Sequence, residues 1–301
     1  MKVGFIGLGK MGLNMALNVL DDNWDIIGFD VSQDVREFAI EKGVQVEDSL
    51  EGLFSQLESR KIIFISTPSG EITNRLVDEL SLHLKNEDII IDSGNSNYHD
   101  SIENYKKLQQ RGISFLDCGT SGGIEGARYG ACLMIGGDKT TFNIMEPFFK
   151  SLACENGCIY AGETGSGHYL KMVHNGIEYG MMQAIGEGFD ILQASHYNFD
   201  NEAVAEVWNH GSVIRSWLME LLASGFVSDP NLEKIRGKVN ASGEAKWTIE
   251  EALKLSIPVP VISNSLFVRN ASQIEDSFTN KVVSTLRQGF GGHEIFEKDE
   301  V

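Results

Sequence analysis

The stretch KVGFIGLGKMG (residues 2–12) decides the fold. A short apolar run ends in three glycines with the spacing GxGxxG, and a helical pattern follows directly. Such glycines permit a tight turn and a close approach of a pyrophosphate, and the N-terminus of the following helix attracts anions. The motif alone would also suit an ordinary glycine-rich turn, but a strand before it and a helix after it are what a dinucleotide-binding unit requires. We therefore predict cofactor binding by Gly7, Leu8, Gly9, Lys10, Met11 and Gly12.

Asp30 ends the next apolar run, DIIGFD, about 20 residues further on, where a carboxylate binds the ribose hydroxyls of the adenosine. Such a carboxylate repels a 2′-phosphate, and the next three residues supply no cation to receive one. Arg36, one turn into the following helix, could still reach such a phosphate. Asp30 could also act only as a turn or cap residue before QDVREFA. The sequence favours NAD over NADP.

The chain has two parts that differ in their pattern of apolar residues. Up to about residue 163, helix-like stretches such as SLEGLFSQLES and SIENYKKLQQRG alternate with the apolar runs KVGFIGLG, DIIGFD, KIIFISTP, DIIIDSG, SFLDCG and ACLMIGG. This alternation predicts a parallel, doubly wound α/β sheet of the Rossmann type. After GETGSG (residues 162–167) helical periodicity continues to the end. We expect a dinucleotide-binding domain over residues 1–165 and an all-helical domain over residues 166–301.

The composition excludes several classes of protein. The 301 residues include 25 basic and 43 acidic side chains, so the net charge of −18 makes nucleic acid a poor partner. No stretch approaches the roughly 18 apolar residues of a membrane span, and no signal-peptide cleavage site follows the N-terminus. The four cysteines show neither a CxxC pair nor zinc-ligand spacing. We expect reduced thiols, no metal and a cytoplasmic protein, in which an anionic substrate would need a local cationic pocket.

The segment KMVHNGIEYG (residues 171–180) carries a polar stripe. On a helix that turns about 100° per residue, one arc holds Lys171, His174, Asn175 and Glu178. Gly176 and Gly180 lie on the opposite side, where we expect another backbone to pack closely. A polar stripe on a helix is usually only solvated, although a His-Asn pair between Lys and Glu is a less expected set. The pattern alone leaves a solvated face and a catalytic stripe equally open.

Three motifs in this order resemble the 6-phosphogluconate dehydrogenase family: DSGNSNY (residues 92–98), FLDCGTSGGIEGARYG (115–130) and KMVHNGIEYG (171–180). The resemblance covers nearly the whole chain, whose length suits the shorter bacterial form with an unduplicated helical domain. It implies oxidative decarboxylation of 6-phospho-D-gluconate to D-ribulose 5-phosphate and CO₂ with NAD or NADP, in the pentose phosphate pathway. It also implies that the helical domain binds substrate and forms a homo-oligomer, either a dimer or a tetramer.

The resemblance further implies roles for individual residues. Lys171 corresponds to the general base that takes the proton of the substrate 3-hydroxyl, and Glu178 to the acid that protonates C1. Asn95 corresponds to a position that touches both nicotinamide and substrate, while Thr67 and Ser69 correspond to cofactor positions. The other implied substrate-binding residues are Ser121, Gly122, Gly123, His174, Asn175, Tyr179, Arg269, Arg287 and His293. Glu178 could instead be a surface carboxylate paired with a neighbouring cation.

The C-terminal RQGFGGH, with Arg287 and His293, matches the family's binding site for the sugar phosphate, as does Arg269 in LFVR. Arginine can hold a phosphate through two parallel hydrogen bonds, so these residues would supply the expected cationic pocket. In the family this tail reaches into the active site of a neighbouring subunit. Arg287 could instead only cap the last helix.

One segment departs from the family pattern. In ASGEAKWT, Ser242 and Glu244 stand where the longer enzymes carry a lysine and a threonine that bind phosphate. Glu244 would repel a phosphate unless it faces away or pairs with Lys246. The departure leaves the affinity for phosphate, and the identity of the sugar acid, open.

Two other functions would use part of these motifs. A β-hydroxyacid dehydrogenase that acts on another acid without decarboxylation would keep the glycine motif, Ser121-Gly122-Gly123 and Lys171. It would need neither Glu178 nor the C-terminal tail. A non-catalytic NAD-binding sensor or scaffold would need only the motifs of the first domain. The full set of acid, base and anion ligands favours the decarboxylating enzyme.

Overall fold

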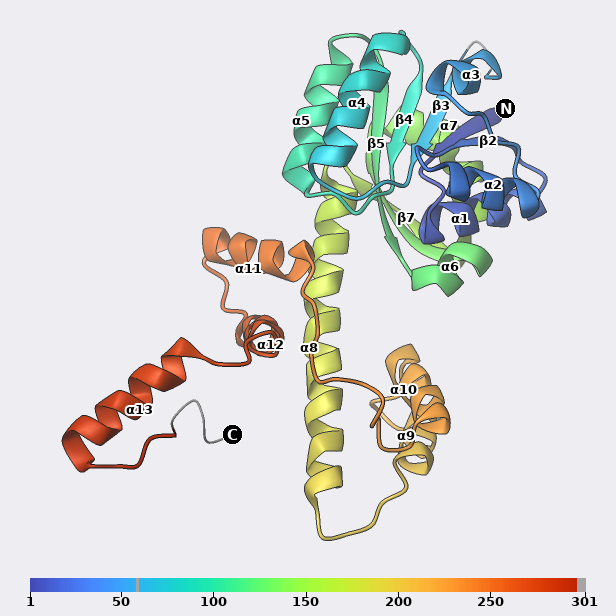
Figure 1. Cartoon of the computed structure of the whole chain (residues 1–301). Coiled ribbons are helices and arrows are strands. Elements are labelled where there is room, and N and C mark those ends of the chain that lie inside the picture. The colour runs from blue at the N-terminus through green and yellow to red at the C-terminus, as the bar shows by residue number, and fades with distance from the viewer. Residues whose placement is uncertain (58–59, 297–301) are drawn as a thin grey trace. The chain divides into compact units, whose positions relative to one another are not determined.

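The chain divides into two units, Met1–Asn175 and Gly176–Val301. They are seen in a computed structural model that describes residues 1–57 and 60–296 (Figure 1). The expected boundary near residue 165 stays a prediction. The predicted helical stretch SLEGLFSQLES ends at residues 58–59, and the predicted tail ends at residues 297–301; these residues lie outside the described part.

A seven-stranded sheet forms the centre of the first unit, in the order β2-β1-β3-β4-β5-β6-β7. Strands β1 to β5 pair in parallel, which confirms the predicted α/β doubly wound class. The strands are β1 (Lys2–Ile6), β2 (Asp25–Phe29), β3 (Ile62–Ile65), β4 (Ile89–Asp92), β5 (Ser114–Ser121), β6 (Ala131–Gly137) and β7 (Ala153–Gly162).

Helices cover both faces of this sheet, as the continuous apolar strands require. Phe64 of β3 belongs to the hydrophobic cluster on one face, whereas its neighbours Ile63 and Ile65 belong to the cluster on the other. The first cluster takes side chains from α1 (Lys10–Asp21), α2 (Gln33–Glu41), α6 (Gly123–Tyr129) and α7 (Lys139–Leu152). The second takes them from α3 (Leu50–Ser55), α4 (Glu71–His83) and α5 (Tyr98–Gln109).

The edge formed by β6 and β7 differs from the prediction. Strand β6 runs antiparallel to β5, because residues 122–130 are too few for a parallel crossover, which needs a dozen or more. Strand β7 was not predicted, since the polar residues CENG interrupt its apolar pattern and its register with β6 is irregular. Both strands still belong to the same sheet, which is therefore mostly parallel.

Every regular element described in the second unit is helical, which confirms the predicted all-α class for this part. The 29-residue α8 (Ser166–Ala194) begins in the first unit and continues in the second. The others are α9 (Asn201–Asn209), α10 (Trp217–Ser228), α11 (Gly243–Leu255), α12 (Pro260–Ala271) and α13 (Phe278–Gly291). Across the described residues, none of the helices is both long and apolar enough to cross a membrane.

Small residues on α8 mark where its neighbours in the second unit come closest. A β-carbon on Gly176 would stand 2.9 Å from Cγ2 of Thr248 on α11. One on Gly180 would stand 3.1 Å from Cγ1 of Val261 on α12. The glycine side of the KMVHNGIEYG segment is therefore packed against other helices, but against their side chains rather than against the backbone that was expected there.

Candidate active site

The glycine loop after β1 has the shape that a dinucleotide pyrophosphate needs. Gly7 has a left-handed backbone (φ +91°), and a β-carbon on Gly12 would stand 1.9 Å from the Gly7 carbonyl oxygen. A β-carbon on Gly9 would meet no atom within 4 Å, so the space in front of the loop is open. No side chain caps the N-terminus of α1, whose N–H groups can bind an anion. These residues fit the cofactor that the motif predicts.

Asp30 stands beside this loop at the end of β2. Its carboxylate accepts hydrogen bonds from the Leu8 N–H (2.8 Å) and the Ser32 N–H (2.9 Å). The turn role considered for Asp30 is therefore present, together with a direct link to the glycine loop. Arg36 donates to the carbonyl oxygens of Asp30 (2.7 Å) and Val31 (3.2 Å). Both bonds come from Nη1 and hold the Arg36 guanidinium against the backbone at the end of β2.

The loop after β3 lies against the same glycines. A β-carbon on Gly7 would stand 2.5 Å from the Ser66 carbonyl oxygen and 3.1 Å from Cγ2 of Thr67. The Thr67 hydroxyl is hydrogen bonded to Thr73 of α4 (2.8 Å). Ser69, further along this loop, is exposed. Thr67 is therefore beside the predicted cofactor loop.

Asn95 joins the carboxyl ends of two neighbouring strands. It has a left-handed backbone (φ +53°), a conformation that asparagine tolerates better than most residues. Its amide nitrogen donates to the Thr120 carbonyl oxygen (3.0 Å), and its amide oxygen accepts from the Thr120 N–H (2.9 Å). The loop after β4 is thereby tied to the residue next to Ser121, the last residue of β5.

The stripe on α8 begins with a buried lysine. Lys171 is 5% exposed, and its Nζ donates to Oδ1 of Asn175 (2.6 Å). His174 Nδ1 lies 2.9 Å from the same oxygen, and His174 Nε2 lies 3.2 Å from Oγ of Ser121. An acceptor at Asn175 Oδ1 requires the Nδ1–H tautomer, so His174 Nε2 accepts from the Ser121 hydroxyl. Within the first unit, α8 and β5 therefore bring Ser121, Lys171, His174 and Asn175 together.

Asp117 of β5 holds the start of α8 on the sheet. Its buried carboxyl accepts hydrogen bonds from the Gly165 N–H (2.6 Å) and the His168 N–H (2.9 Å). Burial raises the pKa of Asp117, although the nearby His168 and these backbone bonds act in the opposite direction. Sequence reasoning missed this positioning residue, for which the only signal was an acidic residue inside the apolar run SFLDCG.

The second unit brings together another part of the predicted set. The Arg269 guanidinium carbon lies 3.4 Å from the ring centroid of Tyr179, which is 4% exposed. The Tyr179 hydroxyl accepts from the Ser242 N–H (2.9 Å) and is hydrogen bonded to the Ser242 hydroxyl (2.9 Å). A cation, a phenol and a serine thus meet beside the N-terminus of α11, whose first turn also carries Glu244.

The structure does not place Arg287 and His293 in this cluster. Helix α13 buries none of its residues, and both side chains are exposed. The last turn of α13 contains no basic residue, so the alternative in which Arg287 caps this turn is not supported. Lys246 pairs with Glu250 (3.6 Å), the neighbour one turn further along α11.

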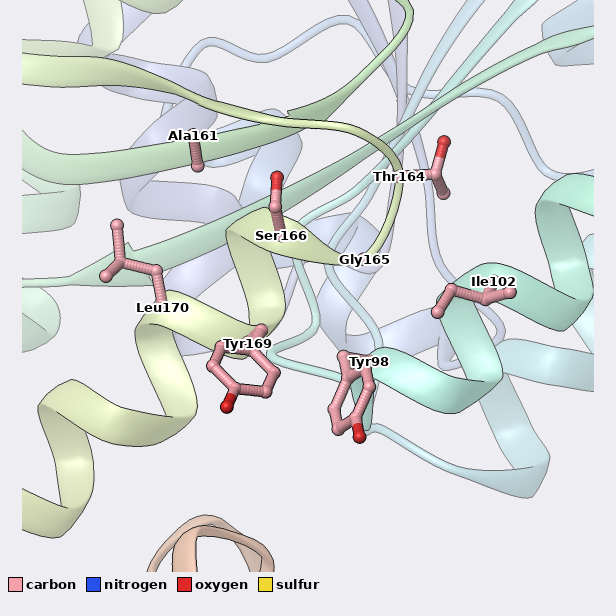
Figure 2. Close-up of a pocket in the computed structure, with 8 residues that line it drawn as sticks. All are labelled: Tyr98, Ile102, Ala161, Thr164, Gly165, Ser166, Tyr169 and Leu170. Atoms are coloured by element: carbon pink, nitrogen blue, oxygen red, sulfur yellow. The ribbon is translucent and has the colours of Figure 1, made fainter. Parts of the chain in front are cut away.

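None of the predicted site residues lines a pocket of about 390 Å³ in the first unit (Figure 2). Tyr98 of α5 and Tyr169 of α8 meet edge to face there, with ring centroids 5.0 Å apart. Tyr169 precedes Lys171 by two residues, which places it on the opposite side of α8. The other residues that line the pocket are Ile102, Ala161, Thr164, Gly165, Ser166 and Leu170.

Comparison with known proteins places these residues in a family. The profile described as the NAD binding domain of 6-phosphogluconate dehydrogenase matches residues 2–162. The profile of the 6-phosphogluconate dehydrogenase C-terminal domain matches residues 167–298. Together the two profiles cover nearly the whole chain, and they support a nicotinamide cofactor for the first unit.

Individual relatives agree with this match. A "putative 6-phosphogluconate dehydrogenase" of Bacillus subtilis is 49% identical over 99% of this chain and 100% of its own length. An NAD(+)-dependent, decarboxylating 6-phosphogluconate dehydrogenase of Haloferax volcanii is 39% identical, with both chains covered completely. The structure of the Plasmodium falciparum 6-phosphogluconate dehydrogenase superposes with a TM-score of 0.83 at 28% identity, covering 100% of this chain and 67% of that one. The protein belongs to the 6-phosphogluconate dehydrogenase family.

Proposed function

We propose that this protein oxidises and decarboxylates 6-phospho-D-gluconate to D-ribulose 5-phosphate and CO₂, with NAD preferred to NADP. The observation that carries the proposal is the hydrogen-bonded set that the buried Lys171 forms with the half-buried His174, Asn175 and Ser121. In a set of this kind the lysine can remove a proton from a substrate hydroxyl, while the neighbouring polar groups orient the sugar acid. Relatives whose names carry this activity match the chain over its whole length.

The glycine loop after β1, Asp30 and the loop that carries Thr67 and Ser69 would hold the dinucleotide. When bound, the nicotinamide supplies a hydride acceptor for the oxidation at C3 of the substrate. Asp30 supports the preference for NAD because its carboxylate repels a 2′-phosphate. The bonds of Arg36 to two backbone carbonyl oxygens support the same preference. The division of the chain into a cofactor part (residues 1–165) and a substrate part (166–301) belongs to this proposal.

Lys171 is assigned the role of general base. As C3 is oxidised, its neutral amine takes the proton of the 3-hydroxyl, while Asn175, whose amide oxygen also accepts from His174, keeps the amine oriented. The resulting 3-keto acid loses CO₂ because its ketone accepts the electron pair of the broken C–C bond. The Lys171 ammonium then stabilises the negative charge that develops on the C3 oxygen.

Glu178 is assigned the role of the acid that protonates C1 of the enediol and so completes ribulose 5-phosphate. Before this step the substrate carboxylate has to be held for cleavage. The backbone N–H groups of Gly122 and Gly123, which follow Ser121 and begin α6, suit a carboxylate. Asn95, fixed to the Thr120 backbone next to Ser121, suits a contact with both nicotinamide and substrate.

The sugar phosphate is assigned to the second unit. Arg269, stacked on Tyr179, is a guanidinium fixed in orientation beside the Ser242 hydroxyl and the N-terminus of α11. Arg287 and His293 would complete this group from a neighbouring subunit of a dimer or tetramer. The exposure of both side chains and the lack of any buried residue on α13 support an arrangement in which this helix packs on another chain.

One assay tests the whole proposal. Purified protein is supplied with 6-phosphogluconate and either NAD or NADP, and reduced cofactor, CO₂ and ribulose 5-phosphate are quantified. Equal amounts of the three products, formed faster with NAD, are expected. Reduced cofactor without CO₂ would favour a simple β-hydroxyacid dehydrogenase. No reduction with any sugar acid, despite NAD binding, would favour the sensor or scaffold.

A further inference from the structure

Two exposed cysteines lie on neighbouring strands at the edge of the sheet. Ala131 of β6 pairs with Ala153 of β7 in parallel, and Cys132 and Cys154 are the next residues on their strands. Successive side chains of a strand point to opposite faces, so the Cys132 thiol points to the face opposite to Ala131. The strands are about 4.8 Å apart at the paired alanines, so Cys132 and Cys154 start from neighbouring points of the sheet edge.

The backbone around Cys154 is irregular in a way that brings its sulfur toward β6. Beyond these cysteines the register shifts, and Leu133 pairs with Cys158. A β-carbon on Gly157 would stand 2.5 Å from Sγ of Cys154 and 2.8 Å from the Ala131 carbonyl oxygen. The Cys154 sulfur therefore lies beside the peptide that leads into Cys132. Because residues 154–157 form the irregular part, this segment can adjust more easily than a regular strand.

Cys132 borders the candidate active site. Cys132 is directly opposite Ser121 in the antiparallel ladder of β5 and β6. The Ser121 hydroxyl is the group that lies 3.2 Å from His174 Nε2. Burial raises the pKa of Cys132, the charge of Cys154 raises it further, and the charge of Lys171 lowers it. Cys132 is thus near enough to feel both the second thiol and the proposed catalytic lysine.

We propose that Cys132 and Cys154 form an oxidisable thiol pair, which a peroxide closes into a disulfide that weakens binding of the sugar acid. Closing the bond draws β6 toward β7 and so displaces Ser121, which faces Cys132 across the ladder. The loss falls on substrate binding, because the glycine loop and Asp30 lie at other strands of the sheet. The effect on turnover rests on the proposed function, whereas the formation of the bond does not.

The chemistry needs one equivalent of hydrogen peroxide. The Cys154 thiolate attacks one peroxide oxygen, the O–O bond breaks, and hydroxide leaves as a sulfenic acid forms. The Cys132 thiolate then attacks the sulfenic sulfur, the S–O bond breaks, and a second hydroxide leaves as the S–S bond forms. The two protons released by the thiols convert both hydroxides to water. Cys154 reacts first in this scheme, because the raised pKa of Cys132 lowers its thiolate fraction.

The other two cysteines differ from Cys132 and Cys154 in their exposure and position. Cys118 is fully buried, which protects it from a peroxide in solution. Cys158 is half-buried on β7, and burial raises its pKa to about 11. It pairs with Leu133, so it points to the face of the sheet opposite to Cys132. Cys158→Ser is therefore a matched control that removes a thiol from the same strand.

The test exposes the reduced full-length protein and its Cys132→Ser, Cys154→Ser and Cys158→Ser variants to hydrogen peroxide, followed by alkylation of the remaining thiols. Peptide mass spectrometry should find a Cys132–Cys154 cross-link in the natural protein and in Cys158→Ser. In these two proteins KM for 6-phosphogluconate should rise about 10- to 100-fold, the loss that small displacements in a site produce. Kd for NAD should not change, and dithiothreitol should restore KM.

Three results would overturn the proposal. The first is the absence of the cross-link in the natural protein, or its presence only in chains joined as a dimer on a non-reducing gel. The second is equal loss of substrate binding in Cys132→Ser, Cys154→Ser and the natural protein. The third is a cross-link that leaves KM unchanged. A protein that forms the cross-link but never turns over 6-phosphogluconate would instead contradict the proposed function, because the cross-link is measured without activity.

Discussion

The β-carbon of Lys171 lies 2.6 Å from the point where a β-carbon on Gly119 would stand. That point is also 2.7 Å from the Gly167 carbonyl oxygen, so α8 crosses β5 in direct contact with its backbone. No side chain fits between the strand and the helix at this crossing. The position of the proposed base is therefore set by the absence of a methyl group on β5.

Gly119→Ala should disable the protein without removing any functional group. The added methyl group must push Lys171 and α8 away, at a cost of about 1–3 kcal/mol in the free energy of unfolding. Displacement of the amine should lower kcat by about 10- to 100-fold. Urea unfolding and steady-state kinetics measure the two effects. Gly188→Ala on α8, where a β-carbon meets nothing within 4 Å, is the control and should keep normal kcat.

Asp30→Asn should narrow the preference for NAD over NADP. The amide keeps one oxygen to accept from Leu8 or Ser32 but loses the charge that repels a 2′-phosphate. The ratio of kcat/KM for the two cofactors is the measurement. Arg36→Ala should leave that ratio unchanged, because its guanidinium is bound to backbone carbonyl oxygens. Equal use of both cofactors by the natural protein would show that Asp30 does not face the ribose.

Lys171→Met and Glu178→Gln should fail at different steps. The first removes general-base catalysis, usually worth about 10²- to 10⁴-fold, and should nearly abolish hydride transfer. The second should slow protonation at C1 after oxidation and decarboxylation, so that stopped-flow traces show a burst of NADH before a slow steady state. Both variants should bind NAD normally. Substantial turnover by Lys171→Met on every sugar acid would mean that the stripe is only structural.

Mixing two defective variants should restore activity if the tail completes a neighbouring site. Arg287→Ala should raise KM for the phosphorylated substrate, and Lys171→Met should lack the base. In a mixed dimer, one site would have both defects and the other neither, so random exchange should give about one quarter of normal activity. The measurement is activity at low substrate concentration after co-refolding. No gain over the separate variants would show that each tail serves its own chain.

Glu244→Gln should improve the affinity for the phosphorylated acid. Two like charges about 4 Å apart in water repel by about 1 kcal/mol, so removing one should lower KM for 6-phosphogluconate about fivefold. KM for unphosphorylated gluconate should not change. Glu250→Gln on the same helix, where Glu250 pairs with Lys246, should change neither value. An unchanged KM in Glu244→Gln would place Glu244 away from the phosphate.

The parallel part of the fold could be predicted because its strands are short apolar runs with glycines at their ends. The β6–β7 edge could not, for two reasons. The six apolar runs do not indicate in which direction β6 runs. That direction follows from the length of the connection through α6. The residues CENG interrupt the apolar pattern of β7, and the strand is irregular there. Local patterns report periodicity, whereas strand direction depends on what the connection can span.

The residues of the candidate site also fall into those that could be predicted from the sequence and those that could not. Lys171, His174 and Asn175 were found because helical spacing groups them on one arc, and the contacts of His174 and Asn175 agree with that grouping. Asp117 was missed, since its role is to accept hydrogen bonds from the N–H groups of two residues about fifty positions away. Gly119 was missed as well, because a close approach between a strand and a helix leaves no periodic signal. Both residues act through the tertiary structure alone.

The continuity of α8 limits how this protein can vary. A single residue inserted between Lys171 and Glu178 would rotate the two side chains relative to each other by about 100° and separate them by a further 1.5 Å or so. The residue types in this segment can change one at a time, but gains and losses of residues cannot be absorbed locally, because no loop interrupts the helix. Length variation has to be accommodated outside this helix, in loops such as those after β2 and between α10 and α11. The number of residues from Lys171 to Glu178 is thus as much a part of the site as the two side chains themselves.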